Sequence, residues 1–377
     1  MKLLKPNIIH FFIKITKFCN LRCKYCYEFP YLGDKRKIEL ASARKMFVTL
    51  AAHYRGTGQI LHFIWHGGEP FVLPPSYYRA LFALQTEILQ EEGILFENSV
   101  QTNLTILSAD WLDALKENIF DSIGVSIDMV GDDRVNRAGK TVDDKVLANM
   151  QTLIDNQIVF GTITVLSAQT QPKMMDIYRF FCEIRTNCSL IPIQKNGLAT
   201  QDNLLTLNPL QIVETYISLF EAWLTASDAV LIDPIDHYTN CAIAYLNPAY
   251  QPQFYDKSVS DSLFIINTDG KIYGDIYANN FEYDSYFGNI FEASFDSILA
   301  SQTYQSVVAV SRARMKAICA ACPYFGYCPG DPVGKGSLDD LSLDATGNLA
   351  CQVVRPFLDY AVNRLKKDNL VQFCGDS

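Results

Sequence analysis

Three cysteines near the start of this 377-residue chain are spaced closely enough to act together. Cys19, Cys23 and Cys26 follow the pattern C-x3-C-x2-C, directly after an apolar run at residues 8–15. Iron–sulfur clusters prefer thiolate ligands, so three thiolates on one short loop can bind three irons of a [4Fe–4S] cluster. The fourth iron would stay open to a second ligand. The spacing therefore predicts a reactive iron site.

A structural zinc site is the alternative for this loop. Zinc usually takes four protein ligands, often in paired C-x2-C spacing, and no fourth ligand lies close to residues 19–26 in the sequence. A second set does supply four cysteines: Cys319, Cys322, Cys328 and, further on, Cys351. Spacing alone leaves this second set open between zinc and an iron–sulfur cluster. A non-enzymatic zinc-binding protein stays a possible interpretation of both sets.

A glycine-rich turn follows the second apolar run, and its residues are Trp65-His66-Gly67-Gly68-Glu69-Pro70. Paired glycines let a backbone approach a ligand closely, and carboxylate or carbonyl oxygens can accept hydrogen bonds from an ammonium group. A tight turn between a strand and a helix explains the same residues. Polar residues also end the next two strand patterns, at 101–103 and 125–128, where simple strand-end caps are the alternative.

Alternating strand and helix patterns must position these motifs. Strand patterns lie at 8–16, 60–65, 97–102, 122–128, 158–166 and 188–193, and helical patterns at 39–55, 75–92, 108–117, 142–155, 171–184 and 208–225. Such alternation favours right-handed βαβ units with a parallel sheet, so we predict an α/β fold, a partial (β/α)6 TIM-like barrel. The loops at the carboxyl ends of its strands converge, and each motif falls on one of them.

The alternation stops near residue 226. Residues 262–275 predict a hairpin that turns at Asp269-Gly270, short helices are expected within 293–309, and a final helix at 354–367. We predict two domains, a barrel over 1–228 and a cysteine-rich domain over 229–377.

Composition restricts the class of protein. The net charge of −9 argues against broad binding to nucleic acid or an anionic membrane, because both need a basic face. No run of about 18 apolar residues could span a bilayer, and residues 1–15 do not resemble a signal peptide. We expect a cytoplasmic protein with no nucleic-acid or membrane partner, in which clustered cysteines ligate metal.

The cysteine loop, with an aromatic residue before its third cysteine, and the Gly-Gly-Glu-Pro turn one strand later closely resemble the radical S-adenosylmethionine (SAM) enzymes. The resemblance covers nearly the whole chain. It implies that Cys19, Cys23 and Cys26 hold the catalytic cluster and that SAM chelates the open iron. The reduced cluster would split SAM into methionine and a 5′-deoxyadenosyl radical, which removes a hydrogen from an unactivated C–H bond.

The resemblance also implies residues that bind SAM or lie near the cluster. These are Tyr25, His66, Gly67, Gly68, Glu69, Asn103, Ser126, Asp128, Lys145 and Val165. The glycine turn would meet the amino group, the polar strand ends the ribose and carboxylate, and Val165 the adenine. Lys145 falls near a position where relatives carry a carboxylate-binding arginine, although a solvated helix face explains it equally well. The segment 134–139 also resembles family sequence.

The second cysteine set resembles the auxiliary-cluster domain called SPASM, which ends many peptide-modifying radical SAM enzymes. This implies that Cys319, Cys322, Cys328 and Cys351 hold an auxiliary [4Fe–4S] cluster. The full family pattern has two further cysteines, where this chain has Asp275 and Pro332. We therefore expect one auxiliary cluster rather than two, and we expect the substrate to occupy part of the space of the missing one.

Relatives with these features mostly act on peptides. The resemblance implies a ribosomally made precursor peptide as substrate and an electron donor such as flavodoxin or ferredoxin as partner. It favours an intramolecular crosslink of cyclophane type, between an aromatic ring and a β-carbon. One alternative is a small-molecule oxidase, and another is formylglycine formation in sulfatases. Ile276 weakens the sulfatase alternative, because enzymes that form formylglycine carry an Asp base at the matching position. With about seven residues before the first strand, we expect no leader-binding domain ahead of the barrel.

Overall fold

The strands form one continuous sheet. The structure, a computed structural model, describes residues 2–193, 205–274, 286–328, 330, 333 and 351–367. Within these residues the sheet has the strand order β10-β9-β8-β1-β2-β3-β4-β5-β6-β7. The strands are β1 (Ile8–Thr16), β2 (Ile60–Gly67), β3 (Phe96–Thr102), β4 (Ser122–Ser126), β5 (Gly161–Leu166), β6 (Cys188–Pro192), β7 (Ile232–Asp233), β8 (Leu263–Ile266), β9 (Lys271–Tyr273) and β10 (Gly288–Asn289).

The parallel part of the sheet confirms the predicted fold class. Strands β1 to β7 pair in parallel with their sequence neighbours. The predicted hairpin is also present, because β8 and β9 pair antiparallel around Gly270 at φ +86°. Sequence reasoning missed that β8 pairs in parallel with β1, with His10 opposite Leu263. The hairpin thus extends the barrel sheet at its first strand.

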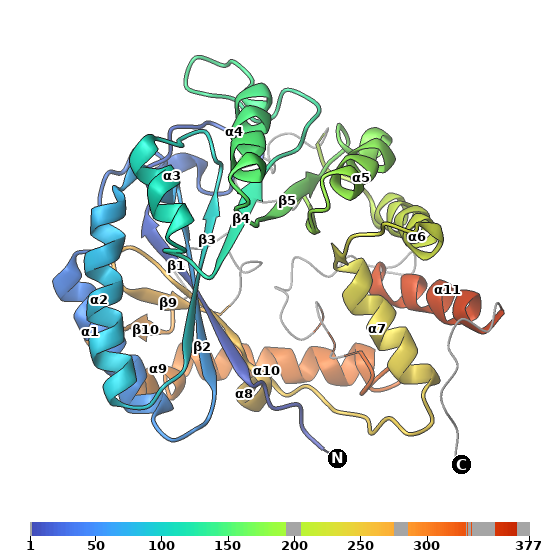
Figure 1. Cartoon of the computed structure of the whole chain (residues 1–377). Coiled ribbons are helices and arrows are strands. Elements are labelled where there is room, and N and C mark those ends of the chain that lie inside the picture. The colour runs from blue at the N-terminus through green and yellow to red at the C-terminus, as the bar shows by residue number, and fades with distance from the viewer. Residues whose placement is uncertain are drawn as a thin grey trace, which may run out of the picture.

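Helices cover the outer face of this curved sheet, with α1 to α6 arranged around it in Figure 1. They are α1 (Leu40–Tyr54), α2 (Pro75–Glu91), α3 (Ala109–Lys116), α4 (Asp143–Asp155), α5 (Met174–Glu183) and α6 (Pro209–Thr225). Each lies within two or three residues of its predicted bounds. The later helices are α7 (Ile235–Leu246), α8 (Lys257–Ser260), α9 (Phe295–Leu299), α10 (Gln302–Arg314) and α11 (Val354–Lys367). Of these, α7 and α8 were not predicted.

Alternation along β1 separates the helix-facing core from the barrel interior. Phe11 is fully buried and packs on Phe63 of β2 and Phe264 of β8, with ring centroids 5.8 Å apart in both pairs. Phe12 and Lys14 point to the opposite face and line a cavity inside the barrel. Because side chains alternate between the two faces of a strand, this register places the polar side chains of the strands on the face inside the barrel.

The last helix joins the C-terminal part to the barrel. Arg364 of α11 forms an ion pair of 2.8 Å with Glu221 of α6, and the Tyr360 hydroxyl donates to the same carboxylate at 2.9 Å. Phe357 packs edge-on against Phe220 with centroids 5.7 Å apart. The predicted boundary between 228 and 229 stays a prediction, and β7 pairs with β6 across it. No helix in the described residues is long and apolar enough to cross a membrane.

Candidate active site at the carboxyl ends of the strands

One cavity of about 300 Å³ lies where the parallel strands end. Its wall combines the predicted cysteine loop, the glycine turn and the polar strand ends. The predicted residues that line it are Cys19, Cys23, Tyr25, Cys26, His66, Gly67, Gly68, Asn103, Ser126 and Val165. Cys19 and Val165, which are 146 positions apart in the sequence, thus meet at one edge of the sheet, as the parallel topology requires. Glu69, Asp128 and Lys145 do not line the cavity.

Backbone hydrogen bonds hold the cysteine loop from two sides. The Cys19 N–H donates to the Leu32 carbonyl at 3.2 Å, within the segment that follows the loop. On the other side, the Arg22 N–H donates to the Val135 carbonyl at 2.7 Å and the Lys24 N–H to the Asp133 carbonyl at 2.8 Å. The segment between β4 and α4 therefore lies along the loop and fixes where its thiols point.

The three thiols of the loop suit a cationic group. Burial raises the pKa of Cys19 to about 12, with a contribution from Glu69, and burial also raises the pKa values of Cys23 and Cys26. Each thiolate would repel the others, so the three thiols are favoured in their neutral form unless a cation balances their charge. Iron binding would reverse this, because the metal requires thiolate and releases the protons. The donor set therefore fits an iron–sulfur cluster.

A single metal ion fits these thiols less well. In the part of the chain that the structure describes, no three His, Cys, Asp or Glu side chains could hold one metal ion. A [4Fe–4S] cluster puts each thiolate on a different iron, so its ligands lie further apart than those of zinc.

Only glycine fits the turn after β2. Gly67 has φ +126°, and a Cβ there would lie 2.2 Å from the Thr16 carbonyl oxygen. A Cβ on Gly68 would lie 2.3 Å from the Phe18 carbonyl oxygen. The close approach lets the Gly68 N–H donate to Thr16 at 2.8 Å and the Glu69 N–H donate to Phe18 at 2.9 Å. The turn is thus locked onto the start of the cysteine loop.

His66 presents a neutral ring to the cavity. Its Nδ1 accepts a hydrogen bond from the Gly67 N–H, so the tautomer consistent with this bond carries its hydrogen on Nε2. Burial lowers the pKa of His66 to about 4, and the positive charge of Lys14 adds to this effect. His66 is therefore a hydrogen-bond donor to the cavity over the physiological pH range.

The Glu69 side chain forms hydrogen bonds within this chain and does not line the cavity. Its carboxylate is fully buried and accepts hydrogen bonds from the Phe71 N–H at 2.9 Å, the Thr102 hydroxyl at 2.6 Å and the Asn103 N–H at 2.7 Å. It thereby ties the glycine turn to the end of β3. The backbone of Gly67 and Gly68, and not this side chain, forms the cavity wall.

Asn103 supports the cysteine loop from β3. Its side-chain N–H groups donate to Asn20 Oδ1 at 3.0 Å and to the Cys19 sulfur at 3.8 Å. Its Oδ1 accepts from the Thr105 N–H at 2.9 Å. A donor to a ligating sulfur tunes an iron–sulfur cluster, so this geometry gives Asn103 a role at the loop besides any contact with SAM.

Ser126 and Gln101 form a polar pair on the cavity wall. The Gln101 Nε2 donates to the Ser126 hydroxyl at 2.8 Å, and both residues line the cavity. Gly124 makes room for this pair, because a Cβ there would lie 2.0 Å from Gln101 Oε1. Gln101 ends a predicted strand, but sequence reasoning assigned it no role. Its inward position on β3 is the signal that identifies it.

Asp128 lies behind the wall and positions two lining residues. Its carboxylate accepts hydrogen bonds from the Tyr25 hydroxyl at 2.6 Å and from the Val165 N–H at 3.0 Å. The side chain is 2% exposed and does not line the cavity. Asp128 thus holds Tyr25 of the cysteine loop and Val165 near the end of β5.

Arg134 is the cationic residue that sequence reasoning did not assign. Its side chain is 5% exposed and lines the cavity, and its Nη1 donates to the Tyr25 hydroxyl at 3.3 Å. The nearest acid is Asp143, 3.8 Å from Nε. Among the described residues, Nε and Nη2 have no hydrogen-bond partner. A buried guanidinium with unused donors is suited to an anionic ligand group. The sequence signal that could have identified Arg134 is its place in the segment 134–139, which resembles family sequence.

Lys145 does not reach the cavity. It is exposed on α4, whereas Arg134 occupies the loop before that helix and lines the wall. The predicted role of Lys145 stays a prediction, and the structure offers a better-placed cation.

The second cysteine set also converges. A separate cavity of about 350 Å³ is lined by all four predicted ligands, Cys319, Cys322, Cys328 and Cys351. Burial raises the pKa of Cys319 to about 12, and the other three thiols add to it. A π-helical turn at Met315–Cys319 carries the first ligand. Four thiols around one cavity fit an auxiliary cluster. Asp275 and Pro332, on which the expected loss of a second auxiliary cluster rests, lie outside the described residues, and so does Ile276, which weakens the sulfatase alternative.

Two domain families match the chain. The radical SAM superfamily matches residues 13–181, and the iron–sulfur cluster-binding SPASM domain matches residues 258–323. The first range contains the cysteine loop and the glycine turn. The second contains Cys319 and Cys322 and ends before Cys328.

Several curated relatives are sulfatase-maturating enzymes. A serine-type enzyme from Bacteroides thetaiotaomicron is 29% identical over 195 residues, which is 49% of this chain and 46% of that protein. The match thus spans about half the length of that relative. A cysteine-type enzyme from Clostridium perfringens is 23% identical over 370 residues, 92% of this chain and 94% of that protein.

Solved structures share the fold. A structure of native anSMEcpe with bound AdoMet and Cp18Cys peptide has a TM-score of 0.74 at 20% identity, and the match covers 97% of this chain and 100% of that one. Streptococcus suis SuiB bound to precursor peptide SuiA has a TM-score of 0.60 at 14% identity, over 94% of this chain and 76% of that one. At these identities the likeness shows the fold alone.

Proposed function

Because this chain carries a radical SAM domain followed by a SPASM domain, we propose that it is an enzyme that oxidises a side chain within a peptide substrate. Radical SAM domains bind SAM and a [4Fe–4S] cluster, and SPASM domains bind auxiliary iron–sulfur clusters. The observation that carries the proposal is the cavity where the cysteine loop, the glycine turn and Arg134 meet.

The cysteine loop is proposed to hold the catalytic cluster through Cys19, Cys23 and Cys26. When bound, the reduced cluster and SAM supply a carbon radical that removes a hydrogen atom from an unactivated C–H bond. The chain itself contributes binding, orientation and exclusion of water. The cluster also requires an external one-electron donor.

The polar half of the cavity is proposed to bind SAM. The backbone of Gly67 and Gly68 approaches the space closely enough to accept hydrogen bonds from the amino group. Arg134, with two unused donor nitrogens, is proposed to bind the carboxylate in place of Lys145. The Gln101–Ser126 pair supplies further polar contacts, and Tyr25 and Val165 pack beside the cofactor.

The apolar half of the cavity is proposed to receive the substrate side chain. Phe12, Ile64, Ile163, Ile191 and Ile265 line it from five strands. Apolar walls exclude water and hold a side chain by shape, which keeps its reacting carbon beside the cofactor. Lys14 and Glu28, both almost fully buried, form an ion pair at this wall. This ion pair is a polar feature on an otherwise apolar wall, and we propose that it helps to orient the bound substrate.

An intramolecular crosslink of cyclophane type is the proposed product. The sequence supports it through the absence of cysteine at positions 275 and 332, which leaves ligands for one auxiliary cluster. Space that a second auxiliary cluster would occupy is then available to a bulky aromatic substrate. The fold likeness to SuiB, solved with its precursor peptide, is compatible with a peptide substrate.

Formylglycine formation is a second candidate, because the match to a cysteine-type sulfatase-maturating enzyme covers 94% of that protein. Ile276 stands where those enzymes are expected to carry an Asp base, which weakens this candidate. A crosslink and formylglycine formation from Ser both remove two hydrogens, so mass alone does not separate those two reactions. Formylglycine formation from Cys also exchanges the sulfur for oxygen and gives a different mass change.

The test is anaerobic incubation of the reconstituted, reduced protein and SAM with two peptide panels. One panel contains short peptides encoded beside its gene, and the other contains sulfatase motifs with Ser or Cys. A crosslink predicts loss of two hydrogens, fragment ions missing between the joined residues, and no reaction with hydroxylamine. Formylglycine predicts a hydroxylamine-reactive aldehyde instead. Turnover of neither panel, with SAM cleavage intact, would contradict a peptide substrate and favour a small-molecule oxidase.

A further inference from the structure

Positive charge is concentrated around the cysteine loop in a chain that is acidic as a whole. The chain has 41 acidic and 32 basic residues. Residues 14–37 reverse this balance, because they contain seven lysines and arginines and two acids, Glu28 and Asp34. Net charges that differ in sign between a segment and its protein create a local field that acts on charged partners.

Two exposed cations, Lys35 of this segment and Arg137 of the segment before α4, lie over the ring of Phe18. The half-buried Phe18 ring has Arg137 4.9 Å and Lys35 5.9 Å from its centroid, and both cations are exposed. A hollow of about 350 Å³ includes Lys35 and is lined on the same side by Arg36, Lys37 and the buried Lys17. Glu39, Thr268 and Asp269 also line it, and Asp269 pairs with Lys271 at 3.4 Å. We call Lys17, Phe18, Lys35, Arg36, Lys37 and Arg137 the Phe18 patch.

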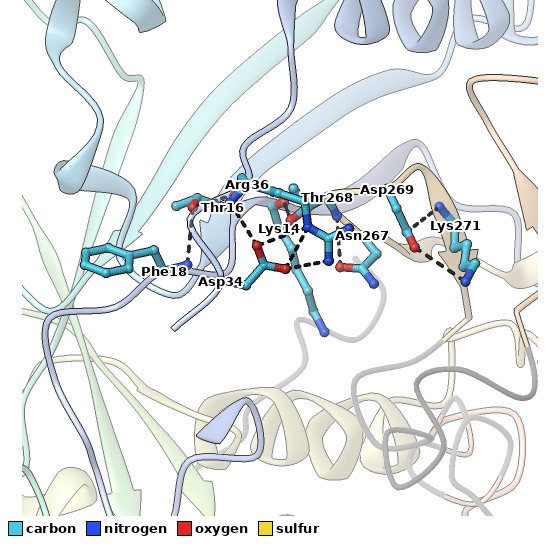
Figure 2. Close-up of polar contacts among 9 residues, drawn as sticks. All are labelled: Lys14, Thr16, Phe18, Asp34, Arg36, Asn267, Thr268, Asp269 and Lys271. Carbon is cyan, nitrogen blue, oxygen red and sulfur yellow. Dashed lines mark hydrogen bonds and ion pairs between the residues drawn. The ribbon is translucent and has the colours of Figure 1, made fainter. Parts of the chain in front are cut away.

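Acidic neighbours neutralise only part of the patch. Figure 2 shows Asp34 facing Arg36, whose Nε donates to both carboxylate oxygens at 3.0 and 2.9 Å. Lys37 pairs with Glu39 at 2.9 Å. Within the described residues, no ion pair joins Lys35 or Arg137 to an acid. These two exposed cations beside an aromatic ring therefore remain available to a negatively charged surface.

The patch lies outside the loop that carries the catalytic cysteines. Phe18 is bonded directly to Cys19, whose thiol lines the cavity, and the Phe18 carbonyl accepts the Glu69 N–H at 2.9 Å. No residue of the patch lines the cavity itself. One backbone segment thus presents cysteine ligands inward and cations outward, which is a short route for an electron.

We propose that the Phe18 patch is the docking surface for an acidic one-electron donor protein that reduces the catalytic cluster. The inference rests on the proposed function, because only a cluster at Cys19, Cys23 and Cys26 needs an electron there. The donor loses one electron and the cluster gains one, with no bond formed or broken. Small, charged surfaces suit such brief encounters, since opposite charges raise the association rate.

An acidic segment of the peptide substrate is a less suitable occupant. The substrate must place a side chain in the cavity inside the barrel, whereas no residue of the patch lines that cavity. A donor needs only to come close to the loop. The charge on the patch and its position next to a ligand both serve electron delivery.

Stopped-flow reduction of the reconstituted, cluster-containing protein tests the proposal. The double variant Lys35→Glu/Arg137→Glu should be reduced by a reduced flavodoxin about tenfold more slowly than wild type at low salt. Salt should shrink this difference, because screening removes steering. The matched control Lys45→Glu/Lys116→Glu changes two exposed lysines on α1 and α3 by the same charge and should keep the wild-type rate.

A small uncharged reductant, photoreduced deazaflavin, separates docking from damage to the loop. All three proteins should be reduced by it at equal rates. Equal rates with flavodoxin would overturn the proposal, and so would a slower reaction of the double variant with deazaflavin. A double variant that loses affinity for acidic peptides but keeps its flavodoxin rate would assign the patch to the substrate. A wild-type protein that holds no reducible cluster would instead refute the proposed function.

Discussion

At the residue scale, the polar side chains near the cavity have two different positions. Arg134, Ser126 and Gln101 face it, whereas Glu69 and Asp128 lie behind it and use their carboxylates on protein donors. A buried carboxylate needs such donors, because loss of its hydration without replacement hydrogen bonds would destabilise the folded protein. The carboxylates therefore shape the site, whereas Arg134 keeps two donor nitrogens, Nε and Nη2, for a ligand.

Replacing Arg134 tests this division. Arg134→Gln should lower SAM affinity about 10- to 100-fold, because a charge-assisted hydrogen bond of roughly 1.5–3 kcal/mol is lost. Lys145→Gln should bind SAM as wild type does. Equilibrium dialysis or calorimetry on the cluster-loaded protein measures both, with absorbance to confirm that each variant holds its cluster. The opposite pattern would return the carboxylate to Lys145.

The neutral ring of His66 has a consequence for stability at low pH. Its pKa is lowered from 6.5 to about 4 in the folded state, so the unfolded chain binds a proton first as pH falls. Its contribution to stability is complete above pH 6.5 and is lost as pH falls toward 4. His66→Gln should therefore flatten the decline in unfolding free energy between pH 6.5 and 4.5, measured by denaturant titration. NMR should show the His66 ring signals unchanged over this range, and a midpoint near 6.5 would refute the assignment.

At the element scale, the glycine turn after β2 and the end of β1 form one unit. Two backbone hydrogen bonds join them, and no side chain fits between Gly68 and the Phe18 carbonyl. The cysteine loop therefore begins from a position that β2 helps to determine. Its geometry depends on this contact as much as on its own residues.

Gly68→Ala should disrupt that unit. A Cβ would lie 2.3 Å from the Phe18 oxygen and 2.4 Å from the Lys17 oxygen, so the strand ends must separate. We expect a loss of at least about 1–3 kcal/mol in unfolding free energy and a depleted catalytic cluster. Gly33→Ala is the matched control, because its Cβ would meet nothing within 4 Å. Thermal unfolding and iron content compare the two, and equal behaviour would contradict the close packing of the turn.

At the scale of the whole molecule, the two cysteine sets line separate cavities and should load independently. Wild type with a catalytic and one auxiliary cluster should hold about eight irons. Cys322→Ala should lose about four and keep some reductive SAM cleavage, whereas Cys23→Ala should lose about four and abolish it. Iron and sulfide analysis with anaerobic spectroscopy checks this. A wild-type content near twelve would mean that ligands exist for a third cluster.

The continuous sheet links the parts that hold these sets. β8 pairs with β1, so the segment that leads to the SPASM cysteines extends the same sheet as the catalytic loop. α11 follows Cys351 and is tied to α6 by the Arg364–Glu221 pair. The distance between the two cysteine cavities is therefore set by the sheet and α11 together.

The sequence by itself determined the local features of this protein. Alternating patterns predicted six parallel strands and their helices, because each pattern reflects which face of an element is buried. Cysteine spacing and the glycine turn likewise predicted the cluster loops, since chemistry on a short loop depends on neighbouring residues. The hairpin at Gly270 was predictable for the same reason.

Only the tertiary structure decided which side chains face the cavity. Whether Glu69 or Arg134 meets a ligand depends on donors from β3 and on acids from α4, far away in the sequence. The pairing of β8 with β1 and the charge around Phe18 likewise arise between distant segments. Sequence patterns report burial and spacing along the chain, whereas hydrogen-bond partners and direction are properties of the packed molecule.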